Sequence, residues 1–434
     1  MHHKLVMTVM IASLACAAIP ALAESPDYVH TTLTGDWDGA RTRMSDLGID
    51  LNLYYTGDFA YNLTGGDRHS GAYASEFDFD GAFDLEKLVG WKGGSFHTEV
   101  ANFHGQLLDA KVNLGSLMDT QEIYDGHGTY LSNFYLEQSL WNGLVDIKYG
   151  RMDFNASFYP TFANLNFQGL SFYGPQPGLM VPDLVDWPTS AIGEVITIKP
   201  SEAWDFKVGN FAVQPNNFVP NDLKVQNRGH RVGNMTVGEL DFFTTLAGGS
   251  KDAPLSGTWA LGGWHNTAPK PDLFLDINGL PQALTGATPL MRGSTSGVYV
   301  TGQQQVTRNA AGGGLTLFMN LVQADSEVDF IDQMSSVGML YAAPFASRPN
   351  DIVGVVLGRN HVSSRVADAN RIINASSFVA VPVPSSEYLL ELNYTASLYR
   401  GITLMPNLQY VRHPGGTKAN RDYTVLGAQL IVSF

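Results

Sequence analysis

The sequence predicts an all-β protein: a transmembrane antiparallel β-barrel of about 16 strands with a short N-terminal periplasmic helix. Many short segments alternate apolar and polar residues, and long and short connections between them follow in turn. Beyond residue 23 no apolar run approaches the roughly 20 residues of a membrane-spanning helix. A chain without such a helix crosses hydrocarbon only as a closed barrel, because every backbone polar group needs a partner there.

Residues 1–23 have the pattern of a secretory signal peptide. A weakly basic start precedes an apolar run over 5–19, and "ALA" at 21–23 has the form of a cleavage site. Cys16 raises the alternative of a lipoprotein acceptor, although Ser13 and Leu14 suit a lipobox poorly. If Cys16 is lost with the signal, the exported chain has no thiol, which fits the outer membrane and also some periplasmic proteins.

The segment 24–48 is predicted to carry the short helix. Asp36 is a candidate cap, and Gly48 is expected to end the helix. Trp37, Ala40, Met44 and Leu47 share one stripe, from which Arg41 and Arg43 project away. The helix is expected either to plug or line the periplasmic mouth or to pack on the barrel rim. The residues expected at this mouth are Asp36, Trp37, Arg41 and Arg43.

Residues 49–434 are predicted to form the barrel, because side chains of period two leave opposite faces of a strand. The clearest alternation lies in "DLNLYYTGDFAYNL" (50–63), "SEFDFDGAFDLEK" (75–87), "EYLLELNYTASL" (387–398) and "ITLMPNLQY" (402–410). Further candidates lie near 94–104, 129–140, 143–151, 190–199, 203–213, 235–247, 256–265, 296–307, 312–323, 337–343, 351–362 and 422–434. Because 235–247 and 337–343 alternate less regularly, 14 or 18 strands remain open.

Connection lengths are a separate test of this topology. The connections are short at 141–143, 200–202, 308–311 and 400–401, and they are long at 105–128, 152–189, 214–234, 266–295 and 363–385. Counted along the chain, each short connection takes the place of a periplasmic turn and each long one the place of an external loop, as in a bacterial barrel with both termini periplasmic. A β-sandwich does not require long and short connections to alternate in this way.

Two blocks resemble the carbohydrate-selective porins of the OprB-type family. "LTGDWDGARTRMSDLGIDLNLYYTG" (33–57) is similar to the opening of that family, and "EYLLELNYTASLYRGITLMPNLQYVRHPGG" (387–416) is similar to its close. The middle piece "QSLWNGLVDIKYGRMDFN" (138–155) is similar more loosely. Asp38 stands where the family often has Gly, which would leave the fold intact and make the mouth more acidic.

The resemblance implies a 16-stranded barrel in the bacterial outer membrane, through which monosaccharides and small sugars diffuse passively into the periplasm. The partners implied are the permeating sugars, outer-membrane lipid and the barrel-assembly machinery, which would engage Phe434. No cofactor is implied. A barrel of this size is wide enough for an aqueous channel, so selectivity needs a narrowing.

An acidic ladder of Glu76, Asp78, Asp80 and Asp84 alternates with aromatic residues, so it is expected to face the lumen with Asp58 and Glu99. Carboxylates bind sugar hydroxyls well, and opposing cations would hold them ionised. Whether Arg359 faces the lumen or the lipid stays open, because apolar residues occur in both alternating sets of its strand: Val353, Val355 and Leu357 in one, and Ile352 and Val356 in the other. The alternative for each position is a solvated wall without a substrate role. The charged channel candidates are Glu76, Asp78, Asp80, Glu99, Lys148, Arg151, Arg359 and Glu391, with Lys207 as a further counter-charge.

The connection 152–189 is the candidate constriction loop. It falls where the third external loop would be, and it is rich in aromatic residues with few charges. Folded inward, it would present rings to the apolar face of a pyranose. The alternative, which is compatible, is that the rings pack the loop onto the inner wall. The aromatic channel candidates are Phe158, Tyr159, Phe172 and Tyr173.

Two functions are alternatives to a sugar porin. A secreted β-rich carbohydrate-binding protein or glycosidase would use two acids as catalytic groups, but it would leave the alternation and the loop parity unexplained. A porin for anionic solutes conflicts with an acidic lumen. The sequence contains no H-E-x-x-H, no G-x-S-x-G and no Cys pair, so no enzyme activity and no metal site are expected. A net charge of −15 argues against nucleic-acid binding.

Fractionation separates the porin from the secreted protein. We expect the chain in the envelope fraction, extractable only with detergent and changing its gel mobility on heating. A monomer that stays soluble in plain buffer would contradict the barrel.

Overall fold

The computed structural model describes residues 27–123, 127–181, 183–214, 221, 223–225, 230–250 and 253–434. The predicted signal peptide, residues 1–23, lies outside the described residues, as does much of the predicted connection 214–234.

Sixteen antiparallel strands close into one barrel, which confirms the predicted fold class and strand number. The segments of weakest alternation, 235–247 and 337–343, lie within two of these strands, β8 and β14. The barrel strands are β1 (Ile49–Thr64), β2 (Gly71–Asp84), β3 (Gly94–Gly105), β4 (Gly128–Leu140), β5 (Val145–Met152), β6 (Ala191–Ser201), β7 (Trp204–Val213), β8 (Gly233–Ser250), β9 (Ala253–Asn266), β12 (Thr295–Gln305), β13 (Gly314–Gln323), β14 (Ile331–Ala342), β15 (Ile352–Val362), β16 (Ser386–Tyr399), β17 (Ile402–Arg412) and β18 (Tyr423–Ser433).

The first and last strands complete the barrel. β1 pairs with β18 from Tyr54 opposite Ser433 to Thr64 opposite Thr424, and with β2 on its other side. A separate hairpin of β10 (Lys270–Asp276) and β11 (Pro289–Arg292) lies within the predicted connection 266–295, and β12 pairs directly with β9. This hairpin was not predicted from the sequence.

The helices are short and lie between strands or before them. They are α1 (Tyr28–Thr31), α2 (Ala40–Asp46), α3 (Leu85–Val89), α4 (Leu108–Val112), α5 (Gln176–Met180), α6 (Gln282–Thr285) and α7 (Ser364–Ser376), with 3-10 turns η1 (Ala163–Asn166) and η2 (Pro414–Gly416). Within the described residues, none of the helices has the length and apolar character needed to cross a membrane.

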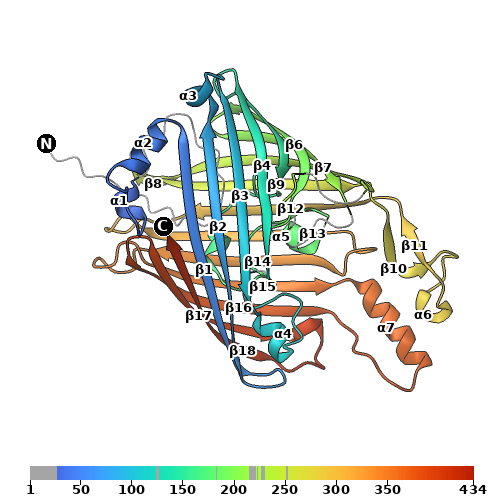
Figure 1. Cartoon of the computed structure of the whole chain (residues 1–434). Coiled ribbons are helices and arrows are strands. Elements are labelled where there is room, and N and C mark those ends of the chain that lie inside the picture. Colours follow the sequence, from blue (N-terminus) through green and yellow to red (C-terminus); the bar gives the residue numbers. More distant parts are fainter. Residues whose placement is uncertain are drawn as a thin grey trace.

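The two ends of the barrel differ. α1, α2 and α3 lie at one end, and β10, β11, α6 and α7 project from the other (Figure 1). We call the second end external and the first periplasmic, because long connections gather at the external end of bacterial barrels. α3 replaces the end of the predicted strand 75–87: the Asp84 carboxylate accepts hydrogen bonds from Glu86 N and Lys87 N and caps this helix.

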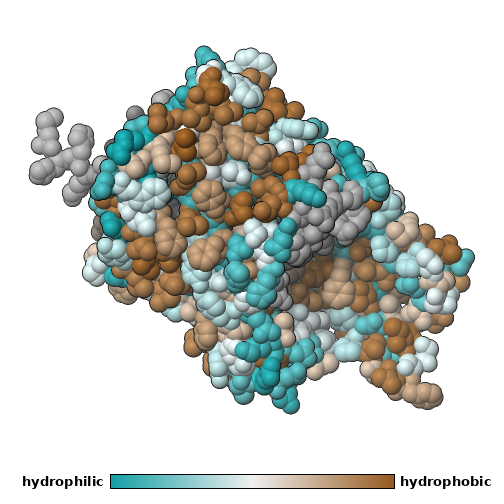
Figure 2. All heavy atoms as spheres, viewed as in Figure 1, coloured by the Kyte–Doolittle hydropathy of each residue, from teal (hydrophilic) through white to brown (hydrophobic). Residues whose placement is uncertain are grey.

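The two faces of the barrel wall have opposite chemistry. On β1 and β2 the outward side chains are large and apolar, whereas Asp58, Glu76 and Asp78 point inward and are buried. Hydrophobic side chains gather over the wall that β1–β4 present in Figure 2. Such a surface matches lipid, whose hydrocarbon accepts apolar groups without cost. The outward set on these two strands includes Leu53, Phe59, Tyr61, Tyr73, Phe77 and Phe79.

External loops are joined by an ion network. Asp272 Oδ2 accepts from Arg292 Nε at 2.8 Å, and Asp272 Oδ1 accepts from Arg365 Nη1 at 3.1 Å. Both arginines also contact Glu327. Burial would raise the pKa of Asp272, but hydrogen bonds from two backbone N–H groups and from Arg292 outweigh it and lower the pKa. The network ties three loops into one rim.

The N-terminal segment packs on the periplasmic rim. α2 begins after Gly39 instead of at a side-chain cap, but Asp36 Oδ1 still accepts from Thr42 N at 2.8 Å. Gly48, just after the helix, has a φ of +91°, which a residue without Cβ adopts easily. Trp37 and Arg43 are exposed.

Arg41 fastens this segment to the barrel seam. Its side chain is only 3% exposed. Nη1 donates to Phe434 O at 2.7 Å and Nη2 donates to Leu51 O at 2.9 Å. The guanidinium also lies over the Tyr28 ring, 4.1 Å from its centroid. Arg41 thus links both strands of the closing pair to the N-terminal helices.

Replacing Arg41 by Ala is expected to lower the free energy of unfolding by about 2–4 kcal/mol, because buried oxygen acceptors lose a charged donor. Urea unfolding from detergent measures this change. Arg43→Ala is the matched control: Arg43 is exposed and donates to Asp38 O, so its loss should stay within about 0.5 kcal/mol. Equal effects of the two variants would contradict the role given to Arg41.

Candidate functional site: the channel lumen

The third external loop, L3 (residues 153–190), folds into the barrel. It leaves β5 and reaches β12, where Thr161 Oγ1 lies 2.7 Å from Thr301 Oγ1 and the Gln303 side chain accepts two backbone N–H groups of the loop. Tyr159 Oη donates to Asn320 Oδ1 of β13 at 2.8 Å. These contacts hold L3 against the inner wall of the barrel. That the connection 152–189 forms the constriction stays a prediction.

A buried carboxylate anchors the far end of L3. Glu391 of β16 accepts hydrogen bonds from Gln168 N at 2.9 Å and from Gly169 N at 2.8 Å. β16 lies nearly opposite β5 in the closed strand order, so the loop spans the lumen. Glu391 was expected to be a wall residue in contact with solutes; the structure buries it completely beneath L3.

The second external loop, L2 (described over residues 106–123 and 127), also enters the lumen through its residues 106–123. Gln409 Nε2 donates to Thr120 O at 2.8 Å, and Gln121 Nε2 donates to Asp58 O at 2.7 Å. Glu387 of β16 accepts from Leu117 N at 2.9 Å. Local sequence patterns give no sign of this inward fold of L2, because it depends on these distant partners.

Most aromatic rings of L3 pack against the wall. Phe154 and Phe158 stack, with ring centroids 5.2 Å apart, and Phe172 packs near Phe167. Glycines on the strands leave room for them: a Cβ at Gly209 would lie 2.9 Å from the Phe158 ring. Phe158 and Phe172 thus pack the loop onto the inner wall, which is the alternative to contact with a sugar. Tyr173, half-buried, donates its N–H to Gly169 O within the same loop.

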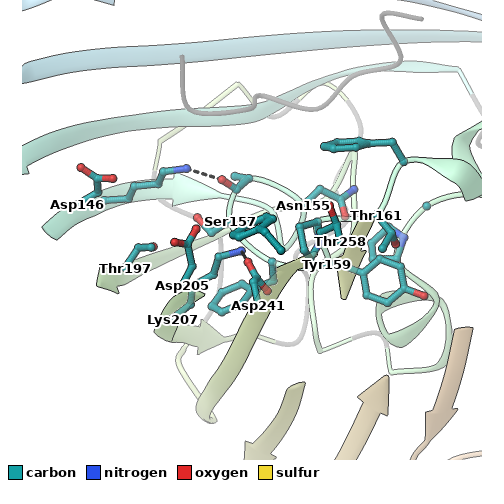
Figure 3. A pocket seen from close by; sticks show the side chains of 18 of the residues that line it. Asp146, Asn155, Ser157, Tyr159, Thr161, Thr197, Asp205, Lys207, Asp241 and Thr258 are labelled. Atoms are coloured by element: carbon teal, nitrogen blue, oxygen red, sulfur yellow. Dashed lines mark hydrogen bonds and ion pairs between the residues drawn. The ribbon is translucent and has the colours of Figure 1, made fainter. Parts of the chain in front are cut away.

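A cavity of about 390 Å³ lies between L3 and the wall of β4–β9. Figure 3 shows Thr197, Asp205, Lys207 and Asp241 on the strands across from Asn155, Ser157, Tyr159 and Thr161 of the loop. This volume is within the range of small-molecule sites, about 300–1,000 Å³. Phe162, which lines the cavity, is 44% exposed, so its ring is available to a solute.

The cations of this wall are paired. Lys207 Nζ lies 2.6 Å from Asp241 Oδ2 and 3.0 Å from Glu239 Oε1. Lys148 Nζ lies 4.0 Å from Glu137 Oε2 and donates to Ala156 O of L3. Arg151 is buried, and its Nε donates to Ser190 Oγ at 2.6 Å. These contacts position the cations along the cavity and at the two roots of L3.

The adjoining wall of β2 and β3, which continues from β4 in the closed strand order, is acidic. Glu76, Asp78 and Asp80 of β2 lie on one face, and Glu99 of β3 is the cross-strand neighbour of Asp80. In the described part of the chain, none of these four carboxylates is within ion-pair distance of a Lys or Arg. The expected counter-charges lie elsewhere, so the lumen has one wall of uncompensated acids and one of paired charges.

Two expected lumen residues lie elsewhere. Arg359 faces outward, on the same side of β15 as the exposed Leu357, and it donates to Ser386 Oγ at 3.0 Å. Val356 and Asn360 take the inward positions of β15. This settles which side chains of the strand face the lumen, and Arg359 is not among them. Asp84, the last residue of β2, uses its carboxylate to cap α3.

The comparisons with known proteins agree with this architecture. The model of the family described as "Carbohydrate-selective porin, OprB family" matches residues 68–434. The chain is 32% identical to Porin B of Pseudomonas aeruginosa, over 97% of this chain and 95% of that protein. It is 27% identical to Putative porin QuiX of Acinetobacter baylyi, over 93% of each. The structure of Pseudomonas putida OprB at high pH has a TM-score of 0.88 at 30% identity, covering 95% of this chain and all of that one.

A closed barrel with an apolar outer face and a polar, loop-narrowed lumen is an outer-membrane porin. This chain belongs to the carbohydrate-selective porin family of the OprB type. It is a sugar channel of the bacterial outer membrane and not an enzyme, so the glycosidase alternative has no support.

Replacing Glu391 by Ala is expected to release L3 and to raise the single-channel conductance, because each hydrogen bond to the carboxylate contributes about 1.5–3 kcal/mol. Planar bilayer recordings measure the change. Glu391→Gln is the intermediate variant: Gln168 N and Gly169 N bond to different oxygens of Glu391, and a single amide oxygen can replace only one of them, so its conductance should lie between those of the wild type and Glu391→Ala. Unchanged conductance in Glu391→Ala would show that L3 does not depend on this anchor.

Proposed function

We propose that monosaccharide-sized sugars cross this porin beneath L3, through the cavity between the loop and the wall of β4–β9. The observation that carries the proposal is that the exposed Phe162 ring lines the same cavity as the polar groups of Lys207, Asp205 and Asp241. A pyranose has an apolar face that stacks on a ring and hydroxyls that bond to charged groups. Passage requires such contacts to be weak enough for release.

We also propose that the channel disfavours anions. The support is the acidic wall of Glu76, Asp78, Asp80 and Glu99, which makes no ion pair within the described residues. A narrow passage with low-dielectric walls concentrates the field of such charges. Neutral sugars are unaffected by this field, whereas an acidic sugar is repelled.

Liposome swelling tests both proposals. We expect glucose to enter faster than a disaccharide, because the cavity is small, and gluconate to enter most slowly, because it is anionic. Phe162→Ala should slow glucose entry, and Phe330→Ala is its matched control, since that ring is 49% exposed in an external loop. Equal rates for the three solutes would contradict the proposed selectivity.

We also propose how the chain reaches the outer membrane. Export by the predicted signal of residues 1–23 and assembly through the barrel-assembly machinery into lipid agree with the outer-membrane location of the family. Phe434 N donates to Leu53 O at 2.9 Å, so the residue proposed to be recognised by that machinery becomes part of the finished seam.

A further inference from the structure

Three carboxylates converge on the inner wall. Asp78 and Asp80 follow one another on the inner face of β2, and Glu99 stands beside them on β3. One oxygen from each lies within 4.8 Å of the other two. Like charges in neighbouring positions of a sheet destabilise it unless something compensates them.

Asp78 is the residue that points to a ligand. Its side chain is 1% exposed, and neither carboxylate oxygen has a hydrogen-bond partner among the described residues. An unsatisfied buried carboxylate is costly, because it has lost its water and gained nothing in return. Glu99, in contrast, accepts from Trp187 Nε1 at 2.5 Å and also from Asn133. Each carboxylate oxygen has more than one lone pair, so Glu99 can accept these hydrogen bonds and still bind a cation.

The surroundings add negative charge. In the described structure no Lys or Arg pairs with the cluster, and Asp153 at the start of L3 shares the Asn133 amide with Glu99. Asp80 is half-buried, so one side of the cluster meets the water of the lumen. A cation could enter from that side with part of its hydration shell.

We propose that Asp78, Asp80 and Glu99 bind a divalent cation of the Ca²⁺ type. Carboxylate oxygens and water are the ligands that Ca²⁺ prefers, at about 2.3–2.6 Å, so two oxygens on opposite sides of the ion lie roughly 4.6–5.2 Å apart. The observed spacing fits that geometry. No sequence motif indicated this site, because its ligands come from two strands and meet only through their register.

The site also reaches the constriction. Trp187 lies near the end of L3, and Asp153 near its start, and both are connected to the cluster through Glu99 and Asn133. A bound cation would therefore neutralise the acidic wall and hold both roots of L3 against it. Ca²⁺ is expected to raise the temperature at which the barrel unfolds and to make passage less selective against anions.

Terbium luminescence tests the proposal on the whole purified protein in detergent. Tb³⁺ occupies Ca²⁺ sites, and excitation of Trp187 should sensitise its emission because the indole contacts Glu99. We expect saturable emission after removal of metals with EDTA, and competition by Ca²⁺. The Asp78→Asn, Asp80→Asn double variant should weaken binding about tenfold or more, because ligand charge sets the affinity for Ca²⁺.

Two further variants keep the result interpretable. Asp67→Asn removes a carboxylate from an exposed external loop and should leave Tb³⁺ binding unchanged. Trp187→Phe should lose the emission while calorimetry still detects Ca²⁺. Absence of saturable binding, or equal binding by the double variant with its heat-dependent gel mobility intact, would overturn the site. Glucose entry in EDTA is measured separately, so either proposal can fail alone.

Discussion

The structure depends on one constraint: within hydrocarbon, every backbone N–H and C=O must be paired inside the protein. A sheet meets this condition only if its two edges join, which makes the β1–β18 pairing the contact on which the other strands rely. Arg41 reinforces this seam from the periplasmic side, because its guanidinium reaches oxygens of both closing strands. The N-terminal helices are thus fastened to the seam.

Closure creates the second problem, which is how to fill a wide lumen without blocking it. Here L2 and L3 fold inward, and buried carboxylates on β16 hold them through their backbone N–H groups. Each carboxylate satisfies two or more donors that would otherwise be stranded inside the barrel. The loops therefore shape the passage, and the strands supply both the anchors and the walls.

The two parts of the inner wall differ in how their charges are balanced. Along the cavity, Lys207 is held between Asp241 and Glu239, so charges are present but balanced. On the adjoining strands β2 and β3, the carboxylates stand together without such partners in the described structure. This asymmetry gives the passage both groups that bond hydroxyls and a region that attracts cations, and it separates the sugar pathway from the proposed cation site.

The amino-acid sequence by itself determined the closed barrel of about 16 strands, with 14 or 18 left open, and the inward or outward position of Asp58, Glu76, Asp78 and Phe79, since period-two alternation and turn length are local properties. It did not decide where Arg359 points, because apolar residues occur at both parities of β15. It also missed the inward fold of L2 and the burial of Glu391. Those features depend on contacts between residues hundreds of positions apart, such as Gly169 with Glu391, which exist only once the closed sheet brings opposite walls within reach of the same loop.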